Sequence, residues 1–118
     1  FSSNCLDTSD GKRFLEEVSR ILKPSGLFFS YFPSKSSDSW TLEQKVDRCD
    51  QNTLHGFKRK KSPYFGNNYA FRFHSREEYQ RLIQNVGLEI VWFETLGRTY
   101  GSGNEYFEFL VVEARLTS

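Results

Sequence analysis

GKRFLEEVSRILKPSGLFFSYF, residues 11–32, holds a helix, a stop and a strand in direct succession. Its first half repeats apolar residues at helical spacing, which predicts an amphipathic helix near 11–23 with one buried face, formed by Phe14, Leu15, Val18, Ile21 and Leu22. Asp10 is the expected N-cap, with Thr8 and Ser9 as alternatives. Pro24 cannot continue the helix and Gly26 permits a tight turn, so the helix is expected to end before them.

The second half of this stretch predicts a strand at 27–32. Its residues are apolar at every position except Ser30. Such a continuous run is typical of a parallel strand that is covered on both faces. We therefore expect an α/β fold in which this strand lies inside a layered sheet.

A second helix and two further strands are predicted toward the C-terminus. Ser75 and Glu78 have the spacing of a capping box, which starts a helix near 76–86, and Gly87 is the expected left-handed stop. Polar residues within 88–96 indicate a strand near a sheet edge, whereas the apolar centre of 106–116 indicates an interior strand. The glycine-rich residues 97–104 are expected to be a loop, and the two strands an antiparallel pair.

The region 34–73 is less regular. A serine-rich loop at 33–39 precedes a short helix expected at about 40–50, where Thr41 and Gln44 form a candidate capping box. Residues 51–73 show no clean period and are expected to be irregular. They are also rich in aromatic side chains, which need a buried place, so we do not expect disorder.

Composition narrows the class of protein. The 118 residues include 16 basic and 15 acidic ones, a formal charge of +1, which gives no global reason to expect a nucleic-acid or membrane partner. No apolar run approaches the roughly 18 residues of a membrane span. Cys5 and Cys49 fit no metal-binding spacing and are expected to be reduced thiols of a cytoplasmic protein. Because the chain begins with Phe1 and has no methionine, we expect a fragment or a processed product.

Three segments together resemble class I S-adenosylmethionine-dependent methyltransferases. The order F-L-E-E-V-x-R-I-L-K-P-S-G-L-F-F resembles the helix and fifth strand of that family, HSREEYQRLIQNVGLEIVWFE the next helix and sixth strand, and EYFEFLVVEARL the seventh strand. The resemblance covers about residues 1–32 and 74–116. It implies one domain that is part of a Rossmann-like sheet, with a further strand near 1–5 and the antiparallel last strand between the fifth and the sixth. Residues 34–73 would be an insertion that covers the substrate like a lid.

The same resemblance implies that the cofactor-binding half is absent. The family holds S-adenosylmethionine mainly through a glycine-rich turn after the first strand and an acidic residue that ends the second strand, and neither lies before Phe1. Gly97-x-x-x-Gly101-x-Gly103 stands between two strands rather than before a helix, so we interpret it as a flexible loop. S-adenosylmethionine is therefore expected as the cofactor of the complete protein, and the 118-residue chain alone is expected to bind it poorly.

Site residues follow from the resemblance. Ser3, Asn4, Cys5 and Leu6 correspond to the end of the family's fourth strand, which lies beside the cofactor's methyl group and the substrate. Asp7 either accepts a proton from the substrate or caps the helix that follows, and we favour the cap.

Aromatic residues around the insertion are expected to shape a pocket for the methyl acceptor, although core packing explains each of them equally well. They are Phe32, Trp40, Tyr64, Tyr69 and Phe73. The basic run 58–61 is interpreted as a solvated loop rather than a nucleic-acid contact. His55 and His74 lack partners at metal-binding spacing, and we expect His74 to pack or turn rather than to catalyse.

These observations favour the C-terminal part of a methyltransferase that acts on a small molecule. The alternative is a non-catalytic interaction module that keeps half of the fold and binds a partner or a second copy through an exposed sheet edge at 27–32. Nucleic-acid binding through 58–61 is a third hypothesis and predicts strongly salt-dependent association.

Overall fold

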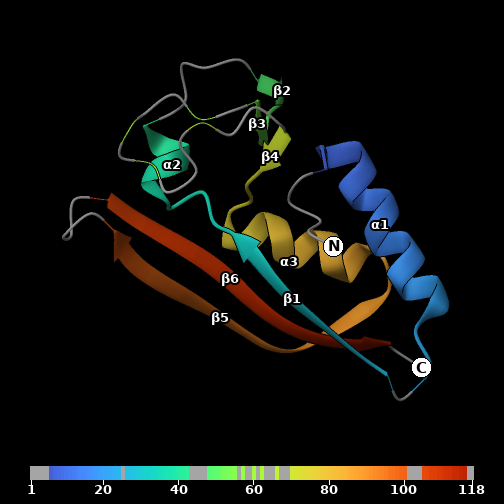
Figure 1. Cartoon of the computed structure of the whole chain (residues 1–118). Coiled ribbons are helices and arrows are strands. Elements are labelled where there is room, and N and C mark those ends of the chain that lie inside the picture. Colours follow the sequence, from blue (N-terminus) through green and yellow to red (C-terminus); the bar gives the residue numbers. More distant parts are fainter. Residues whose placement is uncertain are drawn as a thin grey trace.

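The computed structural model describes residues 6–24, 26–42, 48–55, 57, 60, 62, 66, 70–100 and 105–116. These residues form three helices and six strands in two sheets, as Figure 1 shows. In chain order the elements are α1 (Thr8–Ile21), β1 (Leu27–Pro33), α2 (Asp38–Thr41), β2 (Arg48–Asp50), β3 (Thr53–His55), β4 (Ala70–Arg72), α3 (Arg76–Asn85), β5 (Leu88–Tyr100) and β6 (Glu105–Leu116). The strand predicted near 1–5 lies outside the described residues.

The larger sheet has the order β1-β6-β5. Strand β6 is antiparallel to β1, with Ser30 opposite Val112, and antiparallel to β5, with Phe93 also opposite Val112. The last strand is thus interior and β5 lies at an edge, which confirms the predicted strand order and the antiparallel pair. The expected parallel pairing of β1 is not seen among the described residues, because its described neighbour runs antiparallel.

Helices α1 and α3 cover one face of this sheet (Figure 1). The core between them is apolar, and its fully buried members come from both helices and all three strands: Leu15, Phe32, Tyr79, Ile83, Leu88, Leu110, Val112 and Ala114. Helix α3 begins as predicted, because Ser75 and Glu78 form the full capping box, and it is followed by Gly87 at a φ of 86°.

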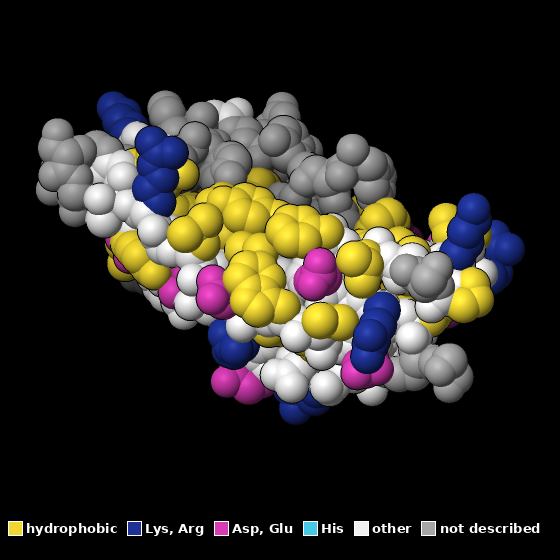
Figure 2. All heavy atoms as spheres, turned by 90° about the horizontal axis from the view of Figure 1, so that it is seen from below, with side chains coloured by type: hydrophobic (Ala, Val, Ile, Leu, Met, Phe, Trp, Pro, Cys, Tyr) yellow, Lys and Arg dark blue, Asp and Glu magenta, His cyan; other side chains and the backbone are white. Residues whose placement is uncertain are grey.

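The other face of the sheet is exposed, so the prediction that β1 is covered on both faces is wrong for the described residues. Leu27, Phe29 and Tyr31 alternate outward along β1, and Phe29 keeps 63% of its surface exposed. Tyr31 stacks on Phe109 of β6 at 4.3 Å between ring centroids. Figure 2 views the molecule from below the sheet and shows hydrophobic side chains gathered there among acidic and basic ones. We call this surface the outer face.

A smaller sheet with the order β2-β3-β4 stands above the carboxyl end of β1 (Figure 1). Its strands β3 and β4 lie within 51–73, where irregular structure was expected. A second core lies beneath it, formed mainly by aromatic side chains: Trp40, Leu54, Phe57, Phe71, Phe73 and Phe107. The aromatic side chains of the insertion that the structure describes in this core, Trp40, Phe57, Phe71 and Phe73, are therefore buried, and Phe107 of β6 packs with them.

The helix predicted at 40–50 is wrong. Helix α2 spans only Asp38–Thr41, and residues 48–50 are strand β2. The early start has a physical cause, because the preceding loop is hydrogen-bonded to β6: the Ser37 hydroxyl donates to the Glu108 carbonyl at 3.1 Å, and the Asp38 carboxylate accepts from Tyr106 N–H at 2.9 Å. Thr41 is the last residue of α2 and Ser37 is the N-cap, so the candidate capping box at Thr41 does not start this helix. Its other member, Gln44, lies outside the described residues.

Strand β5 runs on to Tyr100, so the loop predicted from residue 97 is too long. Gly97 pairs with Glu108, and the Tyr106 side chain lies over it in the space that a Cβ atom would fill. A glycine inside a strand often marks such a close approach rather than a turn. Residues 101–104 lie outside the described part of the chain.

Candidate functional site

The carboxyl end of β1 is where the insertion returns to the main sheet. Ser34 and His74 form an isolated parallel bridge, in which His74 N–H donates to the Pro33 carbonyl at 3.2 Å and Lys35 N–H donates to the His74 carbonyl at 3.0 Å. The end of β4 is thereby held beside the end of β1. Strand ends of this kind are where ligands bind in α/β proteins.

Helix α1 begins at the same place. Asp7 is its N-cap, and the Asp7 carboxylate accepts from Asp10 N–H at 2.9 Å. The capping interpretation of Asp7 is confirmed, and the expectation that Asp10, Thr8 or Ser9 is the N-cap is wrong, because the helix starts at Thr8 rather than near residue 11. A role of Asp7 as a proton acceptor stays a prediction.

Asp50 of β2 explains the early start of α1. Thr8 N–H donates to Asp50 Oδ2 and the Thr8 hydroxyl donates to Asp50 Oδ1, both at 2.9 Å. Burial raises the pKa of Asp50, but hydrogen bonds from Thr8 N–H and Asn52 N–H outweigh burial and leave the pKa below its ordinary value. A carboxylate from the insertion thus completes the first turn of the helix, where negative charge is favourable.

Arg72 of β4 makes a second link between the insertion and α1. Its side chain is almost fully buried, its Nη1 donates to the Asp7 carbonyl at 2.9 Å, and its guanidinium stacks over the Phe32 ring at 4.8 Å. Burial lowers the pKa of Arg72 from its ordinary value. Gly11 makes room for this guanidinium, since a Cβ atom on Gly11 would overlap Arg72 Nη1 and Cζ.

His74 lies next to Arg72 and packs between aromatic rings. Its imidazole stacks on Phe32 at 5.2 Å and on Tyr79 at 5.9 Å between ring centroids. Burial and the nearby positive charge of Arg72 lower the pKa of His74 to about 3, so the ring is neutral at pH 7. The expectation that His74 packs is confirmed.

Glu78 faces His74 from the first turn of α3. Its Oε1 lies 3.8 Å from His74 Nδ1 and 2.9 Å from Lys35 Nζ, and it also accepts from Ser75 N–H at 2.9 Å. Burial raises the pKa of Glu78, but the Ser75 hydrogen bond and Lys35 together lower it below its ordinary value. Glu78 is therefore ionised at neutral pH and is paired with Lys35 rather than with the imidazole.

A cavity of about 240 Å³ opens between these elements. It is lined by residues from the start of α1, the β2–β3 turn, the end of β4 and one side of α3: Thr8, Asn52, His74, Glu78, Arg81, Leu82 and Asn85. We call it the His74 pocket. Six of its seven lining residues are polar or charged, so it offers hydrogen-bonding groups beside apolar surface.

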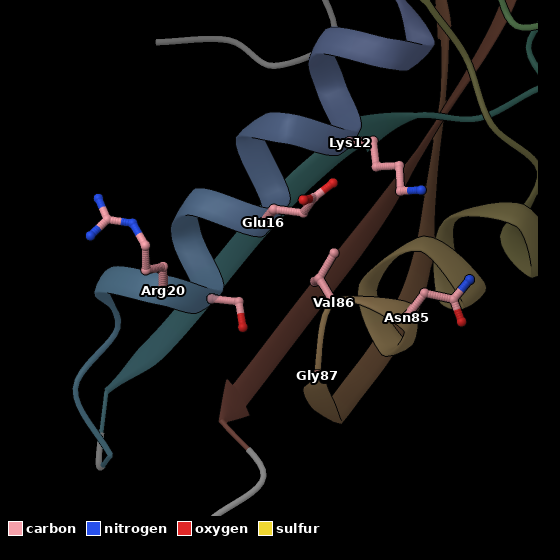
Figure 3. A pocket seen from close by; sticks show the side chains of 7 residues that line it. Lys12, Glu16, Arg20, Asn85, Val86 and Gly87 are labelled. Carbon is pink, nitrogen blue, oxygen red and sulfur yellow. The ribbon is translucent and has the colours of Figure 1, made fainter.

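A larger groove of about 650 Å³ lies between α1 and the end of α3, as Figure 3 shows. Lys12, Glu16, Ser19 and Arg20 line it from the helix α1, and Asn85, Val86 and Gly87 line it from the other side. None of the residues that were predicted as cofactor-binding or substrate-binding lines this groove. Among the described residues, buried side-chain polar atoms without a hydrogen-bond partner occur in His74 and Asn52 of the His74 pocket and in no residue that lines this groove, so we do not take the groove as the functional site.

The structure brings together only some of the predicted site residues. Ser3, Asn4, Cys5, Tyr64 and Tyr69 lie outside the described residues, as does most of the basic run 58–61. Leu6 is half-buried just before α1. Phe32, Trp40 and Phe73 are buried in the two cores, and none of them lines the His74 pocket. Their role in substrate binding stays a prediction.

Sequence reasoning did not identify Asp50, Asn52 or Arg72. The first two could have been found from the sequence, because an aspartate often accepts a hydrogen bond from the N–H two residues later and so forms an Asx turn. In the structure, the Asp50 carboxylate accepts from Asn52 N–H at 2.8 Å. Arg72 had none, because an arginine between two phenylalanines in sequence does not reveal that its partner carbonyl is 65 residues away.

Two absences apply to the described part of the chain. Its His, Cys, Asp and Glu side chains include no group of three or more that could hold a metal ion. None of its helices has the length and apolar character of a bilayer-spanning segment.

Comparison with known proteins identifies the fold. No protein-family model and no curated protein sequence matches the chain. Among solved structures, an S-adenosylmethionine-dependent methyltransferase from Methanosarcina mazei matches with a TM-score of 0.70 at 16% identity, over 98% of this chain and 56% of that one. Another from Clostridium acetobutylicum matches with a TM-score of 0.56 at 15% identity, over 99% of this chain and 55% of that one. This chain thus spans little more than half the length of either structure, and it has the fold of the corresponding part of these S-adenosylmethionine-dependent methyltransferases.

Proposed function

We propose that the chain is the acceptor-side part of an S-adenosylmethionine-dependent methyltransferase that acts on a small molecule. The observation that carries this proposal is the order β1-β6-β5 with α1 and α3 on one face, in a chain that matches such methyltransferases over nearly its whole length. The insertion above the carboxyl end of β1 supports an acceptor site there, because ligands bind at that edge of α/β sheets.

Near the end of β1 the Asp7 carboxylate caps α1 and the Asp50 carboxylate is held by Thr8 and Asn52, so both are engaged in structural hydrogen bonds. We therefore propose that the cofactor is held mainly by a part of the protein outside this chain. The contribution of the chain would be to position the acceptor, and positioning alone can supply a large share of the rate of a bimolecular reaction.

Methyl transfer by the natural protein that carries this sequence tests the proposal. The protein is incubated with tritium-labelled S-adenosylmethionine and pools of small polar molecules, and label in the small-molecule fraction is counted. Transfer that disappears when the pocket residue Asn52 is changed to alanine, but persists in the groove variant Arg20→Ala, supports the proposal. Absence of S-adenosylmethionine binding by the natural protein would overturn it.

The outer face favours a second candidate, the non-catalytic interaction module. Leu27, Phe29 and Tyr31 leave an apolar surface on β1 that no described element covers. Exposed apolar patches commonly mark interaction sites. A natural protein that binds no S-adenosylmethionine and forms a stable dimer at low concentration would favour this candidate.

A further inference from the structure

Strand β5 forms an open edge of the larger sheet. Its 13 residues pair with β6 on one side, and no described strand pairs with it on the other (Figure 1). Every residue from Glu94 to Thr99 is exposed, whichever face of the sheet it lies on. A long, exposed edge strand is a template for pairing with another chain, and natural proteins commonly block such an edge.

The hydrogen bonds of β6 identify which backbone groups of β5 point to this edge. Glu108 of β6 faces the β1 side, because its N–H donates to the Ser37 hydroxyl and its carbonyl accepts from Ser34 N–H, both at 2.8 Å. Gly97 lies opposite Glu108 and therefore directs its own N–H and C=O away from β6. In an antiparallel ladder every second residue does the same. The residues that present their backbone groups to the open edge in this way are Thr95, Gly97 and Thr99.

Arg76 of α3 supports this assignment. Its Nη2 donates to the Phe93 carbonyl at 3.2 Å, so that carbonyl also points away from β6, as the alternation requires. The register between β5 and β6 is continuous from residue 92 to residue 100, because the one irregularity lies between Ile90 and Trp92. The open part of the edge therefore begins after Phe93.

The charges on β5 select one way to pair with a second copy. Glu94 and Arg98 lie on the same face of the strand but about 13 Å apart along it, so they cannot pair within one chain. Neither forms an ion pair with another described residue. In an antiparallel pair of β5 strands with a two-fold axis at Leu96, Glu94 of each copy lies opposite Arg98 of the other. An axis at Glu94 or Arg98 places like charges opposite each other, and an axis at Thr95 or Gly97 leaves both charges without an opposite one.

The same register suits the other residues of the edge. Leu96 lies opposite Leu96 of the second copy, and Trp92 lies opposite Tyr100, an aromatic pair of the kind that stabilises neighbouring strands. Thr95 lies opposite Gly97, so their outward backbone groups can exchange hydrogen bonds. Leu96 and Trp92 keep 53% and 43% of their surface exposed in the single chain, and covering them is favourable.

We propose that the open edge of β5 is a dimerisation site whose partner is a second copy of this chain. The two β5 strands pair antiparallel about an axis at Leu96 and join two three-stranded sheets into one. Two single strands bury little surface against each other, and small interfaces are typical of weak, reversible association. We therefore expect a dissociation constant in the micromolar range. The dimer is independent of the proposed methyl transfer.

Charge reversal tests the register. Sedimentation equilibrium is measured on the 118-residue chain carrying Phe29→Ser, so that association through β1 does not mask the dimer. Arg98→Glu should weaken the dimer about tenfold, because two pairs of unlike charges become like pairs. Adding Glu94→Arg restores both pairs in the opposite sense and should return the dissociation constant to within about threefold of the starting value. Arg20→Glu on α1 makes the same change of charge and should leave the dimer unchanged.

A disulfide tests the position of the axis. Residues that lie opposite each other without exchanging hydrogen bonds have Cα atoms about 4.5 Å apart, which is within the range that a disulfide spans. Leu96→Cys should therefore give a covalent dimer on mild oxidation, as seen by non-reducing electrophoresis. Thr95→Cys is the matched control and should give much less, because residue 95 lies opposite Gly97. The parent chain controls for Cys5 and Cys49.

Hydrogen exchange followed by NMR distinguishes edge pairing from other association. Raising the protein concentration should slow exchange of the Thr95 and Gly97 amides, whereas the Leu96 amide already bonds to β6 and should change little. A chain that stays monomeric at millimolar concentration would overturn the proposal. Equal dimerisation of Arg98→Glu and its parent would also overturn it, as would a folded double variant that dimerises no better than Arg98→Glu.

Discussion

The guanidinium of Arg72 occupies the space that a side chain at Gly11 would fill. Gly11 lies in the first turns of α1 and is buried, while Arg72 ends β4 of the insertion. Together with the hydrogen bond from Arg72 to the Asp7 carbonyl, this contact holds the insertion against the start of α1. The contact predicts the effect of Gly11→Ala on the free energy of unfolding, because helix propensity favours alanine and the overlap with Arg72 opposes it.

Gly11→Ala should destabilise the protein. Alanine in a helix interior is favoured over glycine by about 1 kcal/mol, so without the contact the change would stabilise. With the contact, the methyl group displaces a buried guanidinium, and overpacking of this kind costs about 1–3 kcal/mol. Urea denaturation measures the difference, and Lys12→Ala on the exposed side of the same helix is the control, expected within about 0.5 kcal/mol of the parent.

A double-mutant cycle isolates the cause. In an Arg72→Met background the guanidinium is gone, so the added Gly11→Ala should cost less than it does in the parent chain. An equal cost in both backgrounds would mean that the helix itself, and not Arg72, requires glycine.

The free energy of unfolding should depend on pH through His74. Its pKa is lowered from 6.5 to about 3 in the folded protein, so only the unfolded chain takes up this proton in the interval between them. Stability is therefore full above pH 6.5 and falls as the pH drops, by up to about 1.4 kcal/mol per pH unit for one proton. The pKa values of Asp50 and Glu78 are lowered as well, but from 3.8 and 4.5, so between pH 6.5 and 5 His74 contributes more to the change than these two carboxyl groups.

His74→Phe is the matched variant for this measurement. It should flatten the fall in stability between pH 6.5 and 5, because no imidazole remains for the unfolded chain to protonate. Parallel pH curves for parent and variant, from urea denaturation at each pH, would show that His74 does not carry the effect.

The outer face should drive association of the isolated chain. Phe29→Ser removes an exposed apolar ring that contributes little to the core, so it should reduce association without lowering the melting temperature. Leu42→Ser is the control, since Leu42 is 57% exposed but is the C-cap of α2 and belongs to no strand of the sheet. Light scattering with size-exclusion chromatography measures the mass, and equal association of the two variants would rule out the outer face as the cause.

Local signals explain which parts of the fold were predictable. The Ser75–Glu78 capping box, the stop at Gly87 and the apolar centre of β6 depend on neighbours in sequence, and the structure confirms all three. Helix α2 and the start of α1 were misplaced because each is set by a distant partner. Tyr106 and Glu108 of β6 hold the start of α2, and Asp50 holds Thr8 at the start of α1.

The candidate site was less predictable than the fold. The family resemblance predicted a site at Ser3, Asn4, Cys5 and Leu6, of which the structure describes only Leu6. Asp7 was correctly interpreted as a cap. The pocket itself forms where α1, α3 and the insertion meet, and His74 lines it only because β4 returns beside β1. Such a junction has no local signature. Of the aromatic residues expected around an acceptor pocket, the described ones, Phe32, Trp40 and Phe73, lie in the two cores.

Isothermal titration calorimetry with S-adenosylmethionine tests the central claim most directly. The account predicts saturable heat for the natural protein that carries this sequence and none for the 118-residue chain up to millimolar cofactor. Micromolar binding by the 118-residue chain alone would contradict the claim that its fold is the part of a methyltransferase that does not hold the cofactor.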